Sequence, residues 1–131
     1  MVYLNNSLIL KKSVSKKRFY IEYFKSLQPV LSLSDKEIEI LAEIAKISTE
    51  LQPVELFSKE DKEKMLLNAD SRKKICNAAK VKIHHLNNII SNLKSKNVLV
   101  ATSNGYKIHQ DIVIPSINDS SFSIVYVIET E

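Results

Sequence analysis

The sequence predicts a single domain of the α+β class that is mainly helical, with a short β-hairpin and a terminal strand near its C-terminal end. Apolar residues recur at helical spacing in five stretches between residues 16 and 97. A β-branched run followed by the chain's single glycine then predicts a hairpin near residues 98–108. With 131 residues, the chain is long enough for one hydrophobic core and too short for two ordinary domains.

The composition is that of an ordinary globular protein, with 44% hydrophobic and 26% charged residues. The single cysteine, Cys76, excludes an intramolecular disulfide and cannot alone form a cysteine-based zinc site, which favours a reducing compartment. Asn5, Asn6 and Ser7 interrupt the N-terminal apolar run before the core of a signal peptide develops. No stretch of the sequence approaches the roughly 18 apolar residues of a membrane span. We therefore expect a cytoplasmic protein, or a virion protein if a phage encodes it, with no membrane partner.

Residues 16–67 are expected to form a helical support for the domain, preceded by an N-terminal arm at residues 1–15. The first helix is predicted over residues 16–28, where large apolar residues recur at helical spacing: Phe19, Tyr20, Tyr23, Phe24 and Leu27. Gln28 and Pro29 then bias the chain away from helix. This aromatic helix is either the contact element of a dimer or packed wholly inside the domain.

Serine residues mark the starts of the next two helices. Ser34 stands three residues before Glu37 and can cap a helix that ends near Leu51. Ser58 can cap a shorter helix that runs to Leu67. Both helices belong to the expected helical support.

Two further helices are predicted to follow closely on one another. Asp70 or Ser71 is expected to cap a helix that runs to about Ala79. After a brief interruption, a longer helix is expected to end near Asn97. Its inward positions recur at helical spacing: Ile83, Leu86, Ile90 and Leu93, with Ile89 beside them.

The remainder of the chain is predicted to be β-structure. Val98–Val100 and Tyr106–Ile108 form the two strands of a hairpin, joined by a turn at Ser103–Gly105. Asp111–Ile114 continues or follows the return strand. The last strand, Phe122–Ile128, is rich in β-branched and aromatic residues and would present a sticky edge if it were unpaired.

Charge is segregated along the chain, although the net charge is only +4. Residues 11–25 hold six basic residues and one acidic residue, whereas residues 26–70 hold five lysines and ten acidic residues. Residues 71–110 contain all three histidines, no Asp or Glu, and eight basic residues: Arg72, Lys73, Lys74, Lys80, Lys82, Lys94, Lys96 and Lys107. This last segment is therefore suited to contact an anion.

Two helices joined by a tight turn and followed by a β-hairpin form a helix-turn-helix with a wing. Residues 71–108 resemble winged-helix DNA-binding proteins, including regulators of the multiple-antibiotic-resistance type and replication initiators of phages and plasmids. These families commonly end the second helix in a Leu-Lys-Lys-Gly-Leu-Ile run, which corresponds here to the seven residues from Leu93 to Leu99. Asn97 replaces the usual glycine, and asparagine also accepts the left-handed conformation at a helix end.

The residues agree with this resemblance. With its apolar positions turned inward, the second helix exposes Asn, Ser, His and Lys side chains, which can contact base edges and phosphates. Basic residues at the start of the first helix and in the wing can reach the DNA backbone. The residues expected to contact double-stranded DNA are Arg72, Lys73, Lys74, Lys80, Lys82, His84, His85, Asn88, Ser91, Asn92 and Lys107.

The sequence therefore predicts a DNA-binding protein of a phage or mobile element, acting in the control of transcription or replication. The alternative is a virion or assembly subunit of the connector type that uses the same fold for protein contacts. The asparagine-rich face can equally be a solvated surface or a consequence of an AT-rich genome. A homodimer or larger assembly is compatible with both functions. Residues 109–131 form the C-terminal strand region of the single domain.

No set of catalytic residues emerges from the sequence. A glycine-rich phosphate loop, a His-Glu zinc motif and a nucleophilic serine turn are all missing, so neither an enzyme nor a cofactor is expected. His84 and His85 are adjacent on a helix and point about 100° apart, which disfavours a shared metal ion. Glu37, Glu39 and Glu43 are expected on a solvated helix face, and Cys76 is expected to be a small core residue.

Overall fold

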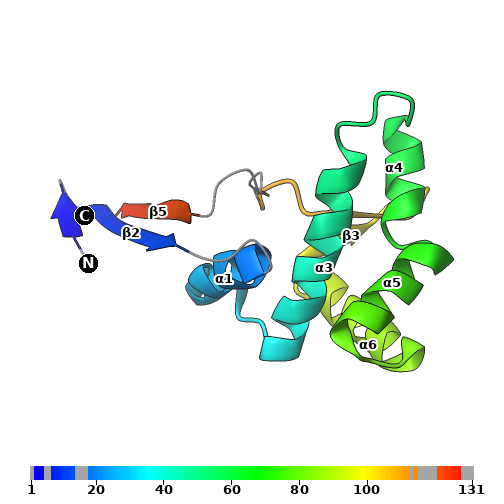
Figure 1. Cartoon of the computed structure of the whole chain (residues 1–131), viewed down its shortest axis with the longest axis horizontal. Helices are drawn as coiled ribbons and strands as arrows, with labels where there is room; N and C mark the ends of the chain where they lie inside the picture. Colours follow the sequence, from blue (N-terminus) through cyan, green and yellow to red (C-terminus); the bar gives the residue numbers. More distant parts are fainter. Residues whose placement is uncertain (1, 5–6, 14–17, 113, 115–120, 128–131) are drawn as a thin grey trace.

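The computed structural model describes residues 2–4, 7–13, 18–112, 114 and 121–127 (Figure 1). Over these residues the fold is α+β, with six helices and two small antiparallel sheets. The helices are α1 (Phe19–Ser26), α2 (Gln28–Leu31), α3 (Asp35–Leu51), α4 (Lys59–Leu66), α5 (Ala69–Ala79) and α6 (Ile83–Ser95). The strands are β1 (Val2–Leu4), β2 (Ser7–Ser13), β3 (Leu99–Ala101), β4 (Tyr106–Ile108) and β5 (Ser121–Val127).

Helix α3 is the centre of the core and contacts α1, α4, α5 and α6. Its start is the predicted capping box, in which the Ser34 hydroxyl accepts from the Glu37 N–H and the Glu37 carboxylate accepts from the Ser34 N–H. Its apolar face is fully buried through Ile38, Leu41 and Ala45, among others. The prediction of a helix from Ser34 to about Leu51 is therefore confirmed.

Helix α1 packs inside the domain through its aromatic side chains. Phe19, Tyr20 and Phe24 are at most 1% exposed and belong to the main core. The structure therefore favours the packed alternative for this helix over a dimer contact. The expectation that helical structure ends at Gln28 is wrong, because the chain resumes a short helix, α2, at that residue. Proline fits the first turn of a helix, where its missing N–H needs no partner.

Helices α4 and α5 follow each other with almost no connection. Ser58 caps α4 as predicted. The cap of α5 is Asn68, whose side chain accepts from the Ser71 N–H, so the prediction of Asp70 or Ser71 as the cap is wrong. Ser71 instead lies inside the first turn, is buried, and donates its hydroxyl to the Met65 carbonyl at 2.6 Å.

Helix α6 presents one apolar face to the core. Leu86, Ile89, Ile90 and Leu93 are buried as predicted. The prediction that Ile83 turns inward is wrong, because this first residue of the helix is 51% exposed. The helix ends as the sequence indicates, with Asn97 in the left-handed region at φ 60° and the Val98 N–H donating to the Leu93 carbonyl.

The hairpin of β3 and β4 packs against two helices, α6 through β3 and α4 through β4. Gly105 in its turn lies so close to α4 that an added Cβ would be 2.4 Å from the Glu63 carbonyl oxygen. The glycine is therefore needed for close approach, and its φ is not positive. Asp111 and Ile112 form a turn, so over the described residues the expected strand at Asp111–Ile114 is not observed.

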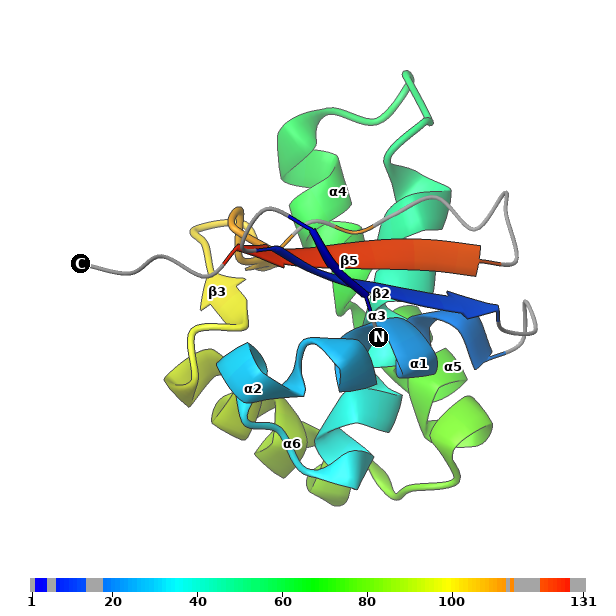
Figure 2. The same ribbon diagram turned by 90° about the vertical axis from the view of Figure 1, so that its left-hand side faces the viewer.

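The second sheet joins the two ends of the described chain in the order β1-β2-β5. It lies beside α1, at the opposite end of the molecule from α4, α5 and α6 (Figures 1 and 2). The prediction of the last strand is confirmed up to Val127, and β5 pairs with β2 along all seven residues. The expected N-terminal arm contains β1 and β2, which the sequence did not predict. Among the described residues, no helix combines the length and apolar character needed to cross a bilayer.

Candidate nucleic-acid interface

The outward face of α6 carries most of the residues predicted to contact DNA. Leu86, Ile89, Ile90 and Leu93 are buried against the core, and the other positions of the helix face solvent, including the apolar Ile83. The exposed polar residues are Lys82 at its N-cap, His84, His85, Asn87, Asn88, Ser91, Asn92, Lys94 and Ser95. The structure therefore brings together six of the eleven predicted residues on one helix.

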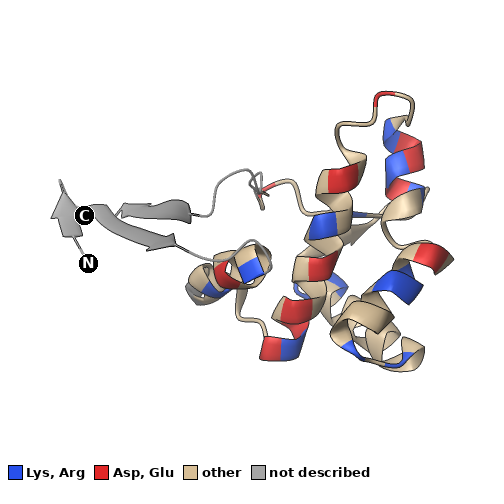
Figure 3. Ribbon diagram, viewed as in Figure 1, with Lys and Arg blue, Asp and Glu red and all other residues tan. Residues whose placement is uncertain are grey.

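Helix α6 and its caps carry basic residues and no acidic residue. Figure 3 shows acidic positions on α1, α3, α4 and the start of α5, and none on α6. Lys73 and Lys74 are exposed on α5, and Lys73 lines a shallow depression together with Ile83 and Asn87 of α6. Lys73 therefore lies beside the N-terminal half of the α6 face, where it can contact a phosphate that the helix approaches.

Arg72 has a different position from its neighbours. Its guanidinium donates to the Leu67 carbonyl at 2.8 Å and to the Asn87 side-chain oxygen at 2.5 Å. It also lies over the Tyr106 ring, with 5.9 Å from the guanidinium carbon to the ring centroid. Arg72 was predicted to contact DNA, and in the structure it connects α5, α6 and the hairpin through these neutral partners.

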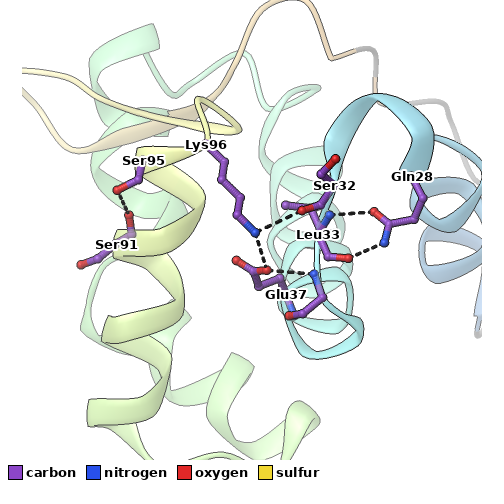
Figure 4. Close-up of polar contacts among 8 residues, drawn as sticks. Gln28, Ser32, Leu33, Glu37, Ser91, Ser95 and Lys96 are labelled. Carbon is purple, nitrogen blue, oxygen red and sulfur yellow. Dashed lines mark hydrogen bonds and ion pairs between the residues drawn. The ribbon is translucent and has the colours of Figure 1, made fainter.

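The C-terminal end of α6 is held by Lys96 (Figure 4). Its ammonium donates to the Glu37 carboxylate at 2.9 Å and to the Ser32 carbonyl at 3.1 Å. Glu37 was expected on a solvated face, and this prediction is wrong because the residue is 5% exposed. Its second carboxylate oxygen is buried and has no hydrogen-bond partner among the described residues.

The charge state of Glu37 follows from these contacts. Burial raises the pKa of the Glu37 carboxyl. Hydrogen bonds from Ser34 and the ammonium of Lys96 together lower the pKa by more, so it lies below the ordinary value of 4.5. The carboxylate is therefore ionised at neutral pH. It links the start of α3 to the end of α6 across 59 positions of sequence.

Two predicted residues lie away from α6. Lys80, in the connection between α5 and α6, adopts a left-handed φ of 56° and borders a depression shared with Arg18 and Lys36 of α1 and α3. Lys107 lines a cavity beside α4 rather than the α6 face. In the part of the chain that the structure describes, no three His, Cys, Asp or Glu residues form a group that could hold a metal ion.

Comparisons of the chain with protein-family models, with curated proteins and with solved structures found no match. What the site can do is therefore inferred from its own chemistry. Asparagine side chains on an exposed helix can pair with adenine edges, serine and histidine can make single contacts, and the bordering lysines can neutralise phosphates.

Proposed function

We propose that this chain is a winged helix-turn-helix protein that binds double-stranded DNA with α6 in the major groove. The arrangement that supports the proposal is α5, a three-residue connection, α6, and the hairpin of β3 and β4. The observation that carries it is the exposed face of α6, which is rich in Asn, Ser and His, is flanked by lysines and contains no acidic residue.

The residues divide into two roles under this proposal. Ser91 and Asn92 lie one turn after Asn88 on the exposed face, and these side chains contact base edges, because amides and hydroxyls can read the hydrogen-bonding groups of the major groove. Lys73 and Lys82 contact phosphates and set the register of the helix on the duplex. The resemblance of residues 71–108 to regulators and replication initiators supports a role in transcription or replication control for a phage or mobile element.

The salt dependence of binding tests this proposal quantitatively. Four exposed lysines lie on α5, on α6 or at the N-cap of α6: Lys73, Lys74, Lys82 and Lys94. If these contact phosphates, the logarithm of the affinity falls with the logarithm of salt concentration at a slope of about −4, whereas all eight basic residues of the segment would give about −7. The measurement is a titration of random and genomic duplexes with the protein at several salt concentrations.

Variants separate the roles in the same assay. The double change Lys82→Ala/Asn88→Ala is expected to weaken binding by tenfold or more, since a bidentate base contact contributes roughly 1–3 kcal/mol. Lys107→Ala is the matched control, because Lys107 lies beside α4 and is expected to leave affinity unchanged. Absence of binding at low salt, or equal binding by the double variant, would refute the proposal.

A second candidate function is that of an assembly subunit. The observation that favours it is β5, which pairs with β2 along one edge and has no partner strand along its other edge among the described strands. An exposed strand edge is a template for pairing with another chain. Sedimentation velocity over a range of protein concentrations tests this function, and a monomer at every concentration would exclude self-assembly.

A further inference from the structure

One hollow among the described residues lies away from α6. It is a cavity of about 490 Å³ between the last turn of α3, the whole of α4, and β4 with the turn that follows it. Half of its lining is apolar, and the side chains responsible are Leu51, Leu66, Tyr106, Ile108, Ile112 and Ile114. Since none of its lining residues belongs to α6, the proposed DNA-binding face does not account for it.

Strand β4 offers an open edge at this cavity. The Thr102 N–H donates to the Gly105 carbonyl at 2.8 Å, and the His109 N–H donates to the Val98 carbonyl at 2.9 Å. In an antiparallel pair, residues whose backbone groups face the partner strand alternate with residues whose groups face away. Because Gly105 and His109 are bonded to the partner strand, the N–H and C=O groups of Tyr106 and Ile108 point away from β3. Within the described part of the chain, those four backbone groups have no hydrogen-bond partner.

The rim of the cavity is positively charged. Lys59 and Lys107 line it, and neither ammonium has a hydrogen-bond or ion-pair partner within the described residues. Lys62 also lines it and donates to the Gln52 carbonyl at 2.7 Å. Glu63 is the single acidic residue in the lining. Because three lysines face one carboxylate, the cavity attracts a negatively charged occupant.

We propose that this cavity binds an extended acidic segment of a partner protein, which adds as a strand to the free edge of β4. Backbone hydrogen bonds to Tyr106 and Ile108 supply affinity, as in other cases of strand addition. The segment combines apolar residues, which suit Leu51 and Leu66, with acidic residues, which suit the lysines. A DNA backbone offers acceptor oxygens but no N–H donors for the Tyr106 and Ile108 carbonyls, so it cannot pair with the β4 edge as a peptide strand does.

The first test is binding of a defined probe to the full chain. The probe is a fluorescein-labelled peptide of six residues that alternates glutamate and valine. Its binding is measured by fluorescence anisotropy. Lys59→Glu/Lys107→Glu is expected to weaken its binding by about tenfold or more, because both charges at the rim change sign. Lys64→Glu is the matched control, since Lys64 is exposed on the same helix but does not line the cavity.

The second test distinguishes strand addition from attraction between charges. The same peptide with N-methyl groups on alternate amides keeps its charge but cannot pair with a strand edge, and it is expected to lose binding. Amide exchange at Tyr106 and Ile108 is expected to slow by tenfold or more when the unmodified peptide is bound to the wild-type chain. If the anisotropy does not change at about 1 mM protein, the binding free energy is weaker than about −4 kcal/mol, and the proposal is overturned. Equal binding of the methylated peptide, or unprotected Tyr106 and Ile108 amides, would overturn it as well.

Discussion

Replacing Lys96 with methionine tests whether the buried carboxylate of Glu37 holds α6 in its position. Methionine keeps the apolar stem of the side chain and removes the ammonium. The Glu37 oxygen then retains the Ser34 N–H at 2.8 Å but loses its charged donor at 2.9 Å. The Ser32 carbonyl also loses the donor that lies 3.1 Å away. The end of α6 is then no longer bonded through this side chain to the start of α3.

The structure sets the size of the effect. Hydrogen bonds to charged groups contribute about 1.5–3 kcal/mol to the free energy of unfolding. Most of this is lost in the variant because the buried carboxylate is left without its charged partner. The Lys96 side chain is 40% exposed, so water replaces part of the interaction and the lower half of the range applies. We expect the free energy of unfolding to fall by about 2 kcal/mol and Tm to fall by about 8 °C.

The effect depends on pH in a defined direction. The pKa of Glu37 in the folded chain is below its ordinary value of 4.5, so the ionised carboxylate stabilises the fold above that pH. This contribution is lost as the pH falls through the lowered pKa of the folded state. The difference between wild type and Lys96→Met is therefore expected to be full at neutral pH and to shrink in acid.

Urea denaturation at neutral pH and in acid measures both expectations. Lys94→Met is the control, because Lys94 is exposed on the preceding turn and has no ion-pair partner among the described residues. It is expected to change stability by less than about 0.5 kcal/mol. If the two variants lose the same stability, or if the loss in Lys96→Met does not change with pH, the assigned role of Glu37 is wrong.

Two further predictions concern the backbone. Lys80→Gly is expected to raise the free energy of unfolding by about 1 kcal/mol, because Lys80 holds a left-handed φ of 56° that glycine adopts without strain. The midpoint of urea denaturation checks this, and Lys80→Ala, which keeps the strain, should not show the gain. Gly105→Ala is expected to cost about 2 kcal/mol in the same measurement, because its Cβ would lie 2.4 Å from the Glu63 carbonyl oxygen. Unchanged stability of Gly105→Ala, compared with Asn104→Ala, would show that the hairpin does not pack tightly on α4.

The sequence predicts the helices well because their signals are local. Ser34 and Ser58 each stand three residues before an acidic residue, and both pairs form capping boxes. The start of α5 was misplaced because Asn68, Asp70 and Ser71 are all competent caps within one turn. The choice among them is tertiary, since Ser71 is buried and its hydroxyl is bonded to another helix end.

Long-range contacts account for what the sequence did not predict. The sequence around Glu37 is typical of a surface residue, because its partner Lys96 lies 59 positions later, at the end of α6. Strand β1 has only three residues, and β5, the strand that completes the sheet with β1 and β2, is at the other end of the chain. Gly105 signals a turn in the sequence, but its real constraint is the backbone of α4. None of these pairings has a signal within a local window of sequence.

Under the proposed function, the number of basic residues between residues 71 and 110 overestimates the number of phosphate contacts. The contacts that hold α6 in position explain why. Arg72 connects the helix to α5 and to Tyr106 of the hairpin, and Lys96 connects its other end to Glu37. Both cations orient the helix, and the charge of Lys96 is already paired with Glu37. A helix held at both ends keeps its exposed asparagines at a defined angle to a groove, and such preorganisation lowers the entropy lost on binding. Under the proposed function, sequence-specific binding would therefore depend on two basic residues that need not touch the DNA.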